Sequence, residues 1–285
     1  MALVNALVQG VLLGGLYALF AAGLSLIFGV MKIVNIAHGD FIVFAAYMAY
    51  FVIQMTGVGP FESLLFVVPL AALIGYALQR GLLNFTLGSE LPPLLVTVSL
   101  SIIIQNALLL GFTADVHRLQ AGAIEIMSWT INREFSIGIL PLIQFGVAVG
   151  IIAGLQLLFY NTAFGRAFRA TSDDAQVAQL MGLDTRHIFA MAMALSLAIV
   201  SVAGVFIAVR TNFNPFSGPA LLIFGFEAII IGGLGNLWGT LAGGILLGVA
   251  QAIGGQINVG LPFTAGHIVF FIVLVLRPQG LFGKA

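Results

Sequence analysis

Long apolar runs separated by short polar breaks dominate this chain. A transmembrane helix needs about 20 apolar residues, and fewer when it is buried in a bundle. Nine runs approach or exceed this length, at 8–30, 36–54, 61–80, 93–113, 138–159, 188–210, 220–234, 240–254 and 263–276. The pattern predicts an all-α, polytopic membrane helical bundle with eight to ten transmembrane helices. We expect residues 1–285 to form a single transmembrane domain.

Two of the runs, 220–234 and 240–254, are short and rich in glycine. We expect them to be tilted, broken or a re-entrant pair. Small residues four positions apart let helix backbones approach closely in a membrane. Glycine is common in membrane helices, which explains isolated pairs, but the run from Gly232 to Gly248 favours a close-packed or backbone-lined pathway. The four-residue spacing occurs at Gly235/Gly239/Gly243, Gly244/Gly248, Gly150/Gly154 and Gly10/Gly14.

The composition agrees with a membrane protein, because 61% of the residues are hydrophobic and 7% are charged, against about 25% charged in soluble domains. The 10 basic and 10 acidic residues cancel, so the chain has no basic footprint for nucleic acid. Without cysteine, disulfides and thiolate metal sites are excluded. The first basic residue is Lys32, so a cleavable signal peptide is not expected. The histidines are too scattered to predict a metal site: His38, His117, His187 and His267.

The distribution of lysine and arginine predicts the orientation, because cytoplasmic loops carry the excess of positive charge. With the N-terminus outside, the inside loops carry seven basic residues and the outside loops three. The inside residues are Lys32, Arg80, Arg166, Arg169, Arg186, Arg277 and Lys284, and the outside ones are Arg118, Arg133 and Arg210. We therefore expect a periplasmic N-terminus, a cytoplasmic C-terminus and a cytoplasmic 160–187 loop. The longest outside loop, about 114–137, also contains Asp115, Glu125 and Glu134.

The 160–187 segment is the most polar part of the chain's second half. Thr171 or Ser172 is a candidate helix cap, followed by Asp173 and Asp174 in a first turn that favours negative charge. Gly182 would then end the helix in a left-handed conformation. The pattern predicts a helix of about ten residues, too short to span a bilayer.

One face of this short helix is apolar, since Val177, Ala178 and Met181 share it. A solvated loop anchored by Arg166 and Arg169 would explain the arginines but would explain the apolar face poorly. We therefore interpret the segment as an element that contacts a partner outside the membrane.

A second polar motif, Asn35-Ile-Ala-His38-Gly39-Asp40, lies between two long apolar runs. Polar groups in a membrane are costly unless they are paired or face a cavity. Asn35, His38 and Asp40 could cap the second helix and form the cytoplasmic end of a passage. A short turn at the membrane interface explains them equally well.

Glu227 is the carboxylate placed most deeply inside an apolar run. An ionisable residue in that position is by default a functional candidate. The alternative is a shorter helix, with Glu227 near its outer end.

Sequence signatures of catalysis are missing. The chain has no Gly-x-x-x-x-Gly-Lys-[Ser/Thr] loop for ATP, no His-Glu-x-x-His and no Gly-x-Ser-x-Gly. The pattern is typical of a conduit, and we expect no catalytic residue, no metal site and no cofactor bound by this chain.

Four motifs resemble the branched-chain amino acid permeases of bacterial ABC importers, in the same order along nearly the whole chain. Their residues are Gly15-Leu-Tyr17 through Gly23, Gly29 and Asn35-Ile-Ala-His38-Gly39; Gly165-Arg166, Arg169, Asp174, Ala178 and Met181-Gly182; Gly232-Gly233-Leu-Gly235-Asn, Gly239 and Gly243-Gly244; and Arg277-Pro-Gln-Gly280-Leu-Phe282-Gly283. The chain is most similar to the shorter of the two permease subunits.

This resemblance implies an inner-membrane permease that binds no ATP itself. A homologous second permease subunit, two cytoplasmic ATPase subunits that use the ATP and a periplasmic substrate-binding protein would complete the transporter. The resemblance assigns ATPase coupling to Arg166, Arg169, Asp174, Ala178, Met181 and Gly182, and the predicted short helix adds Asp173 and Val177. We expect the translocation pathway to include Asn35, His38, Gly39, Glu227, Gly232, Gly233 and Gly235.

The substrate stays open at this point. Related permeases carry branched-chain or other neutral amino acids, or urea and short amides, and Glu227 does not decide among them. An ion-coupled secondary transporter is the rival of another class. Such proteins often show inverted repeats and several intramembrane charges, whereas this chain offers Glu227 and no clear repeat.

Overall fold

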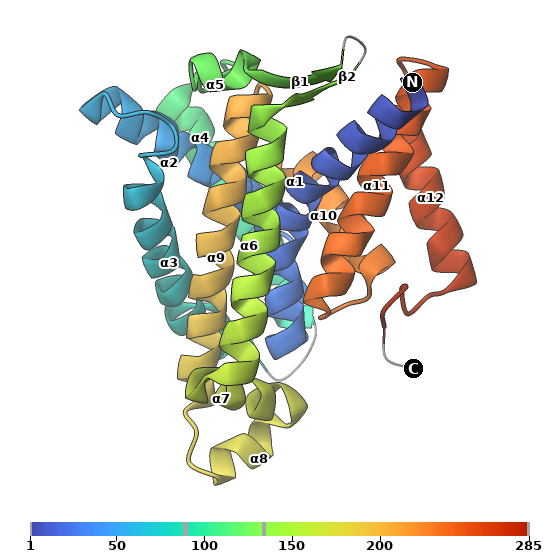
Figure 1. Cartoon of the computed structure of the whole chain (residues 1–285). Coiled ribbons are helices and arrows are strands. Elements are labelled where there is room, and N and C mark those ends of the chain that lie inside the picture. The colour runs from blue at the N-terminus through green and yellow to red at the C-terminus, as the bar shows by residue number, and fades with distance from the viewer. Residues whose placement is uncertain (1, 88–90, 133–134, 284–285) are drawn as a thin grey trace.

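The computed structural model describes residues 2–87, 91–132 and 135–283 (Figure 1). Seven of the described helices are long and apolar enough to cross a membrane, and two shorter apolar helices, α10 and α12, accompany them. The predicted polytopic helical bundle is confirmed. The elements are α1 (Ala2–Met31), α2 (His38–Thr56), α3 (Leu64–Gly81), the 3₁₀ helix η1 (Leu83–Phe85), α4 (Leu91–Phe112), α5 (Ala123–Ile126), β1 (Ser128–Asn132), β2 (Phe135–Gly138), α6 (Ile139–Asn161), α7 (Ala163–Asp173), α8 (Ala175–Leu180), α9 (Thr185–Arg210), α10 (Gly218–Gly232), α11 (Leu237–Ile257) and α12 (Pro262–Leu276).

Two helices form the centre of the bundle. In α1 and α9, 83% of the most apolar window is buried, whereas the value for α3, α4 and α6 is 22%. Apolar side chains on the outer faces of α3, α4 and α12, such as Leu65, Leu110 and Phe271, are exposed. Lipid replaces water around such a surface, because a soluble protein rarely exposes so much contiguous apolar area.

The α11 helix has 21 residues, so our expectation of a short or re-entrant run at 240–254 is wrong. The apolar run at 240–254 is shorter than the helix, because the helix begins before the run does. The polar side chain of Asn236 caps its start by accepting a hydrogen bond from the Gly239 amide (2.9 Å). Glycines then pack α11 against α1. A Cβ on Gly14 would lie 2.4 Å from Ile245 Cα, and one on Gly248 would lie 2.3 Å from the Gly10 carbonyl oxygen. The predicted close packing of this run is confirmed.

A small hairpin covers the end of the bundle opposite α7 and α8 (Figure 1). The antiparallel strands β1 and β2 pair Trp129 with Ile137, and hydrophobic periodicity did not reveal them because each strand is short. In the segment before β1, an ion pair (2.7 Å) connects Arg118 to Glu125 of α5. Arg133 and Glu134, like Lys284, lie outside the described residues.

The polar motif at residues 35–40 lies inside the bundle, so our expectations of a cap on α2 and of a turn at the membrane interface are both wrong, and a role in a passage stays a prediction. Asn35 and His38 are fully buried, and no side chain caps α2 at its N-cap residue, Ala37. His38 Nε2 lies 2.8 Å from the carbonyl oxygen of Phe20, roughly 16 Å along α1 from Met31 at 1.5 Å per residue. The chain between α1 and α2 therefore returns into the bundle before α2 begins.

Candidate functional site

The 160–187 loop folds as two short helices instead of the single helix that we predicted. Thr171, Ser172 and Asp173 belong to α7, which Thr162 caps by accepting from the Gly165 amide (2.9 Å). Asp174 then starts α8 by accepting hydrogen bonds from Gln176 (2.8 Å) and Val177 (3.0 Å). The capping prediction failed because Asp174, with its extended backbone, is the better cap. Gly182 has a φ of 86°, so the predicted left-handed stop is confirmed.

The α8 helix has an exposed apolar face at the tip of the loop. Val177, Leu180 and Met181 are 53%, 86% and 79% exposed, respectively. Ala178 is 3% exposed, so it packs inward, and our assignment of it to this face is wrong. Leu180 was missed, although its spacing of three residues from Val177 is the signal that would have found it. We call Val177, Leu180 and Met181 the α8 face.

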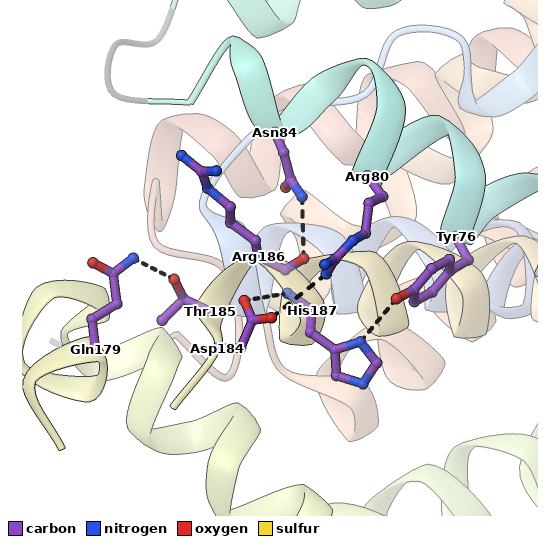
Figure 2. Close-up of polar contacts among 8 residues, drawn as sticks. All are labelled: Tyr76, Arg80, Asn84, Gln179, Asp184, Thr185, Arg186 and His187. Atoms are coloured by element: carbon purple, nitrogen blue, oxygen red, sulfur yellow. Dashed lines mark hydrogen bonds and ion pairs between the residues drawn. The ribbon is translucent and has the colours of Figure 1, made fainter. Parts of the chain in front are cut away.

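Side chains at the start of α9 attach the loop to α3 (Figure 2). Asp184 caps α9 by accepting from the His187 amide (3.1 Å) and lies 3.6 Å from Arg80 of α3. The His187 hydrogen bond, together with Arg80, lowers the pKa of Asp184. Both partners stabilise the ionised form, so the carboxylate stays charged at neutral pH.

Three further polar contacts strengthen this attachment (Figure 2). Tyr76 Oη lies 2.9 Å from His187 Nδ1, and Asn84 donates to the Arg186 carbonyl oxygen (3.2 Å). Gln179 of α8 donates to Thr185 (2.6 Å). Contacts from α3, η1 and α8 therefore converge on the first turn of α9, which is one of the two central helices.

The α7 helix contacts the C-terminal end of α1. Ser172 donates a hydrogen bond to the Gly29 carbonyl oxygen, and the Arg169 guanidinium lies 4.8 Å from the centre of the Tyr160 ring. Arg166 and Asp173, by contrast, are exposed. Of the predicted coupling residues, six are thus accessible to a partner: Arg166, Asp173, Asp174, Val177, Met181 and Gly182.

The glycines that we predicted for the pathway lie where the end of α1, the end of α10, the start of α11 and the C-terminal tail meet. Gly232 packs on Gly239, and a Cβ on Gly235 would lie 3.3 Å from Gly29 Cα. Gly233 contacts the C-terminal tail, whose Leu281 and Phe282 amides donate to the carbonyl oxygens of Ile231 and Gly232 (2.8 and 3.1 Å). These bonds satisfy carbonyl groups that a helix end leaves without partners.

The structure does not bring all the predicted pathway residues together. His38 packs on Phe20, and its neighbour Gly39 packs on Gly218. His38 therefore lies beside the middle of α1, at Phe20, whereas Gly235 lies beside Gly29 near the C-terminal end of the same helix. Glu227 is separate again, because it pairs with His267 of α12.

The Glu227–His267 pair borders a groove between α10 and α12. Glu227 Oε1 is hydrogen-bonded to His267 Nδ1, whereas Oε2 is buried without a partner among the described residues. The Glu227 side chain is 5% exposed and the His267 side chain is 47% exposed. The pair lies within the helices, so the alternative of a shorter helix ending near Glu227 is wrong.

Residues 6–277 match the family model of the branched-chain amino acid transport system permease component. The chain belongs to this family. The permease is thus an integral membrane transport component, and not an enzyme, of the type found in branched-chain amino acid ABC transporters.

Similar proteins share nearly the full length of the permease. The high-affinity branched-chain amino acid transport system permease protein BraD of Pseudomonas aeruginosa is 29% identical, covering 98% of this chain and 95% of BraD. The corresponding LivH of Escherichia coli is 26% identical, covering 97% and 94%. Among solved structures, PsaBC from Streptococcus pneumoniae in complex with Fab matches with a TM-score of 0.48 and 16% identity, covering 99% of this chain and 94% of that one.

Proposed function

We propose that this chain is a permease subunit of a bacterial ABC importer for branched-chain or other neutral amino acids. It forms half of the translocation pathway, beside a homologous second permease subunit. Two cytoplasmic ATPase subunits use the ATP, a periplasmic protein delivers the substrate, and this chain binds no cofactor. The relatives BraD and LivH support the substrate class through what they are described as transporting.

The observation that carries the coupling function is the α8 face. Three large apolar side chains are exposed at the tip of a polar loop, where the bundle does not cover them. Such a patch on a loop is typical of a protein interaction site. We infer that it binds an ATPase subunit, with Arg166, Arg169, Asp173, Asp174, Ala178 and Gly182 shaping or flanking the contact.

The charge distribution supports an orientation with α7 and α8 in the cytoplasm. Arg80, Arg166, Arg169 and Arg186 gather at the α7–α8 end, and Arg118 lies at the opposite end, where it donates to the Val209 carbonyl oxygen (3.1 Å). The positive-inside rule assigns the first end to the cytoplasm. The N-terminus is then periplasmic and the C-terminal tail cytoplasmic.

The pathway assignment stays a proposal for Asn35, His38, Gly39, Gly232, Gly233 and Gly235. Backbone at membrane depth is tolerated where it is buried in protein or lines a wet cavity. The turn before α2 and the turn between α10 and α11 are such places. The φ of 78° at Gly235 makes a Gly235→Leu substitution strained in itself, so that residue is a poor test of the pathway.

A charge on the α8 face tests the coupling function. Val177→Asp and Met181→Glu place a carboxylate in the proposed apolar contact, where desolvation opposes binding. In proteoliposomes with the complete transporter, we expect substrate-stimulated ATP hydrolysis and uptake to fall about tenfold or more, equivalent to 1.4 kcal/mol of contact energy.

Met181→Leu is the matched control, because it keeps an exposed apolar side chain of similar volume at the same position and adds no charge. It should hydrolyse ATP and transport substrate as the unaltered protein does. Normal stimulated hydrolysis in Val177→Asp and Met181→Glu, with the variants inserted in normal amounts, would contradict the proposal.

A further inference from the structure

The groove between α10 and α12 is apolar apart from three side chains. Glu227, Thr264 and His267 supply its polar groups, and Ile268, Phe270, Phe271 and Ile272 supply the rest of its lining. Its position is inside the membrane-spanning part of the protein. At 1.5 Å per residue, His267 lies roughly 8 Å from the start of α12 and 14 Å from its end.

Glu227 is unsuited to a groove filled by lipid tails. A carboxylate at membrane depth is stable only when it is paired or when it faces a wet cavity. One oxygen, Oε1, has His267 as its partner, but Oε2 has none among the described residues although the side chain is 95% buried. The site therefore lacks a hydrogen-bond donor.

His267 is held so that it orients the carboxyl group. Its ring stacks on Phe224 with an interplanar angle of 5° and a centroid distance of 6.2 Å, and its Nδ1 contacts Oε1. Phe224 in turn stacks on Phe263, at 5.5 Å. The stacked ring and the hydrogen bond to Oε1 hold the imidazole beside the carboxyl group.

We propose that the α10–α12 groove binds the α-ammonium group of a neutral amino acid at the carboxylate of Glu227. An ammonium group in the groove supplies the opposite charge. It also supplies the missing donor once the Glu227 side chain turns Oε2 from its buried position toward the groove, and this makes a strong hydrogen bond. The apolar wall at Phe271 and Ile272 receives the aliphatic side chain, as ligand pockets combine apolar lining with a few polar groups. His267 is a positioning residue. This inference rests on the proposed transport function and adds the group that the permease recognises.

The absence of cysteine from the chain allows a direct test in membranes containing the complete transporter. Thr264→Cys places a thiol in the groove. Its labelling by the cationic 2-aminoethyl methanethiosulfonate is compared with that by the anionic 2-sulfonatoethyl methanethiosulfonate, with this subunit isolated for mass analysis. The ratio of the cationic to the anionic labelling rate at this thiol should be about ten times the ratio measured with a free thiol in solution, because the Glu227 carboxylate concentrates positive charge. The preference should disappear in Glu227→Gln.

Small ligands then identify the recognised group. 3-Methylbutylamine, which has an ammonium group and a branched aliphatic chain, should slow labelling of Thr264→Cys several-fold. 4-Methylpentanoate, which has the chain with a carboxylate and no ammonium group, should not. Glu227→Gln should abolish the protection. His267→Leu should weaken it, and His267→Asn should restore it, because the Asn amide can occupy the place of Nδ1.

Val275→Cys is the matched control, since Val275 is exposed on the same helix but does not line the groove. Neither ligand should change its labelling. The inference is overturned if Thr264→Cys reacts with neither reagent, which would mean that protein or lipid fills the groove, or if both ligands protect equally. Leucine uptake by the same transporter is measured separately. Uptake without protection would contradict this inference alone, and absence of uptake in the unaltered transporter would contradict the proposed function.

Discussion

At the scale of single residues, glycines with the same spacing have different surroundings. A Cβ on Gly14 would lie 2.4 Å from Ile245 Cα, but no atom lies within 4 Å of the corresponding position on Gly150. Gly14→Ala should therefore separate α1 from α11 and lower the melting temperature of the purified protein. Gly150→Ala should leave stability unchanged or raise it by about 0.5–1 kcal/mol, because alanine favours the helix. Equal effects of the two substitutions on melting would show that the α1–α11 contact is not close.

The Asp184 carboxylate predicts a pH dependence. Its pKa is lowered by the His187 amide and by Arg80, so its stabilising effect is complete above the unfolded pKa of about 3.9 and is lost as the pH falls through the folded value. The difference in melting temperature between the protein and Asp184→Ala should thus be full at pH 7 and shrink below about pH 4. Asp184→Asn keeps a capping acceptor without the charge, so its difference from Asp184→Ala should not depend on pH.

Residue patterns revealed Glu227 and Gly182 but not all of their surroundings. Glu227 stood out because it is a charge in an apolar run, whereas its partner His267 is 40 positions away and became evident only from the packing of α12 on α10. Asn35 and His38 were recognised as unusual, but their burial depends on the return of the chain into the bundle. Local sequence carries no signal for such long-range contacts.

At the scale of elements, apolar runs located the membrane helices because lipid requires a continuous apolar surface. They did not locate the polar ends of α11 or the break between α7 and α8, where capping side chains decide the boundaries. The β1–β2 hairpin was missed for a different reason, since strands of four or five residues carry little periodicity.

The C-terminal tail should stabilise the C-terminal end of α10. Leu281→Pro removes the amide that donates to Ile231, so we expect hydrogen exchange of the Phe282 amide to accelerate about tenfold, as the loss of a hydrogen bond predicts. Leu281→Ala keeps the amide and is the matched control. Unchanged exchange in Leu281→Pro would mean that the tail is held by other contacts.

At the scale of the whole molecule, the two ends of the helical bundle carry different elements. The α8 face lies at one end and the α5–β1–β2 segment at the other (Figure 1). Contacts from α8 and α3 meet at the first turn of α9, and α7 contacts α1 through Ser172. Because α1 and α9 are the two central helices, movement of the loop would reach the core without passing through lipid-facing helices.

Site-specific photocrosslinking tests the central claim, which is that the α8 face binds an ATPase subunit. Leu180 of α8 and Ile126 of α5 are 86% and 85% exposed, and these two helices lie at opposite ends of the bundle (Figure 1). A benzophenone amino acid in place of Leu180, in membranes containing the complete transporter, should form an adduct with the ATPase subunit, and one in place of Ile126 should not. An ATPase adduct from Ile126, or none from Leu180 in a transporter that purifies intact, would contradict the account.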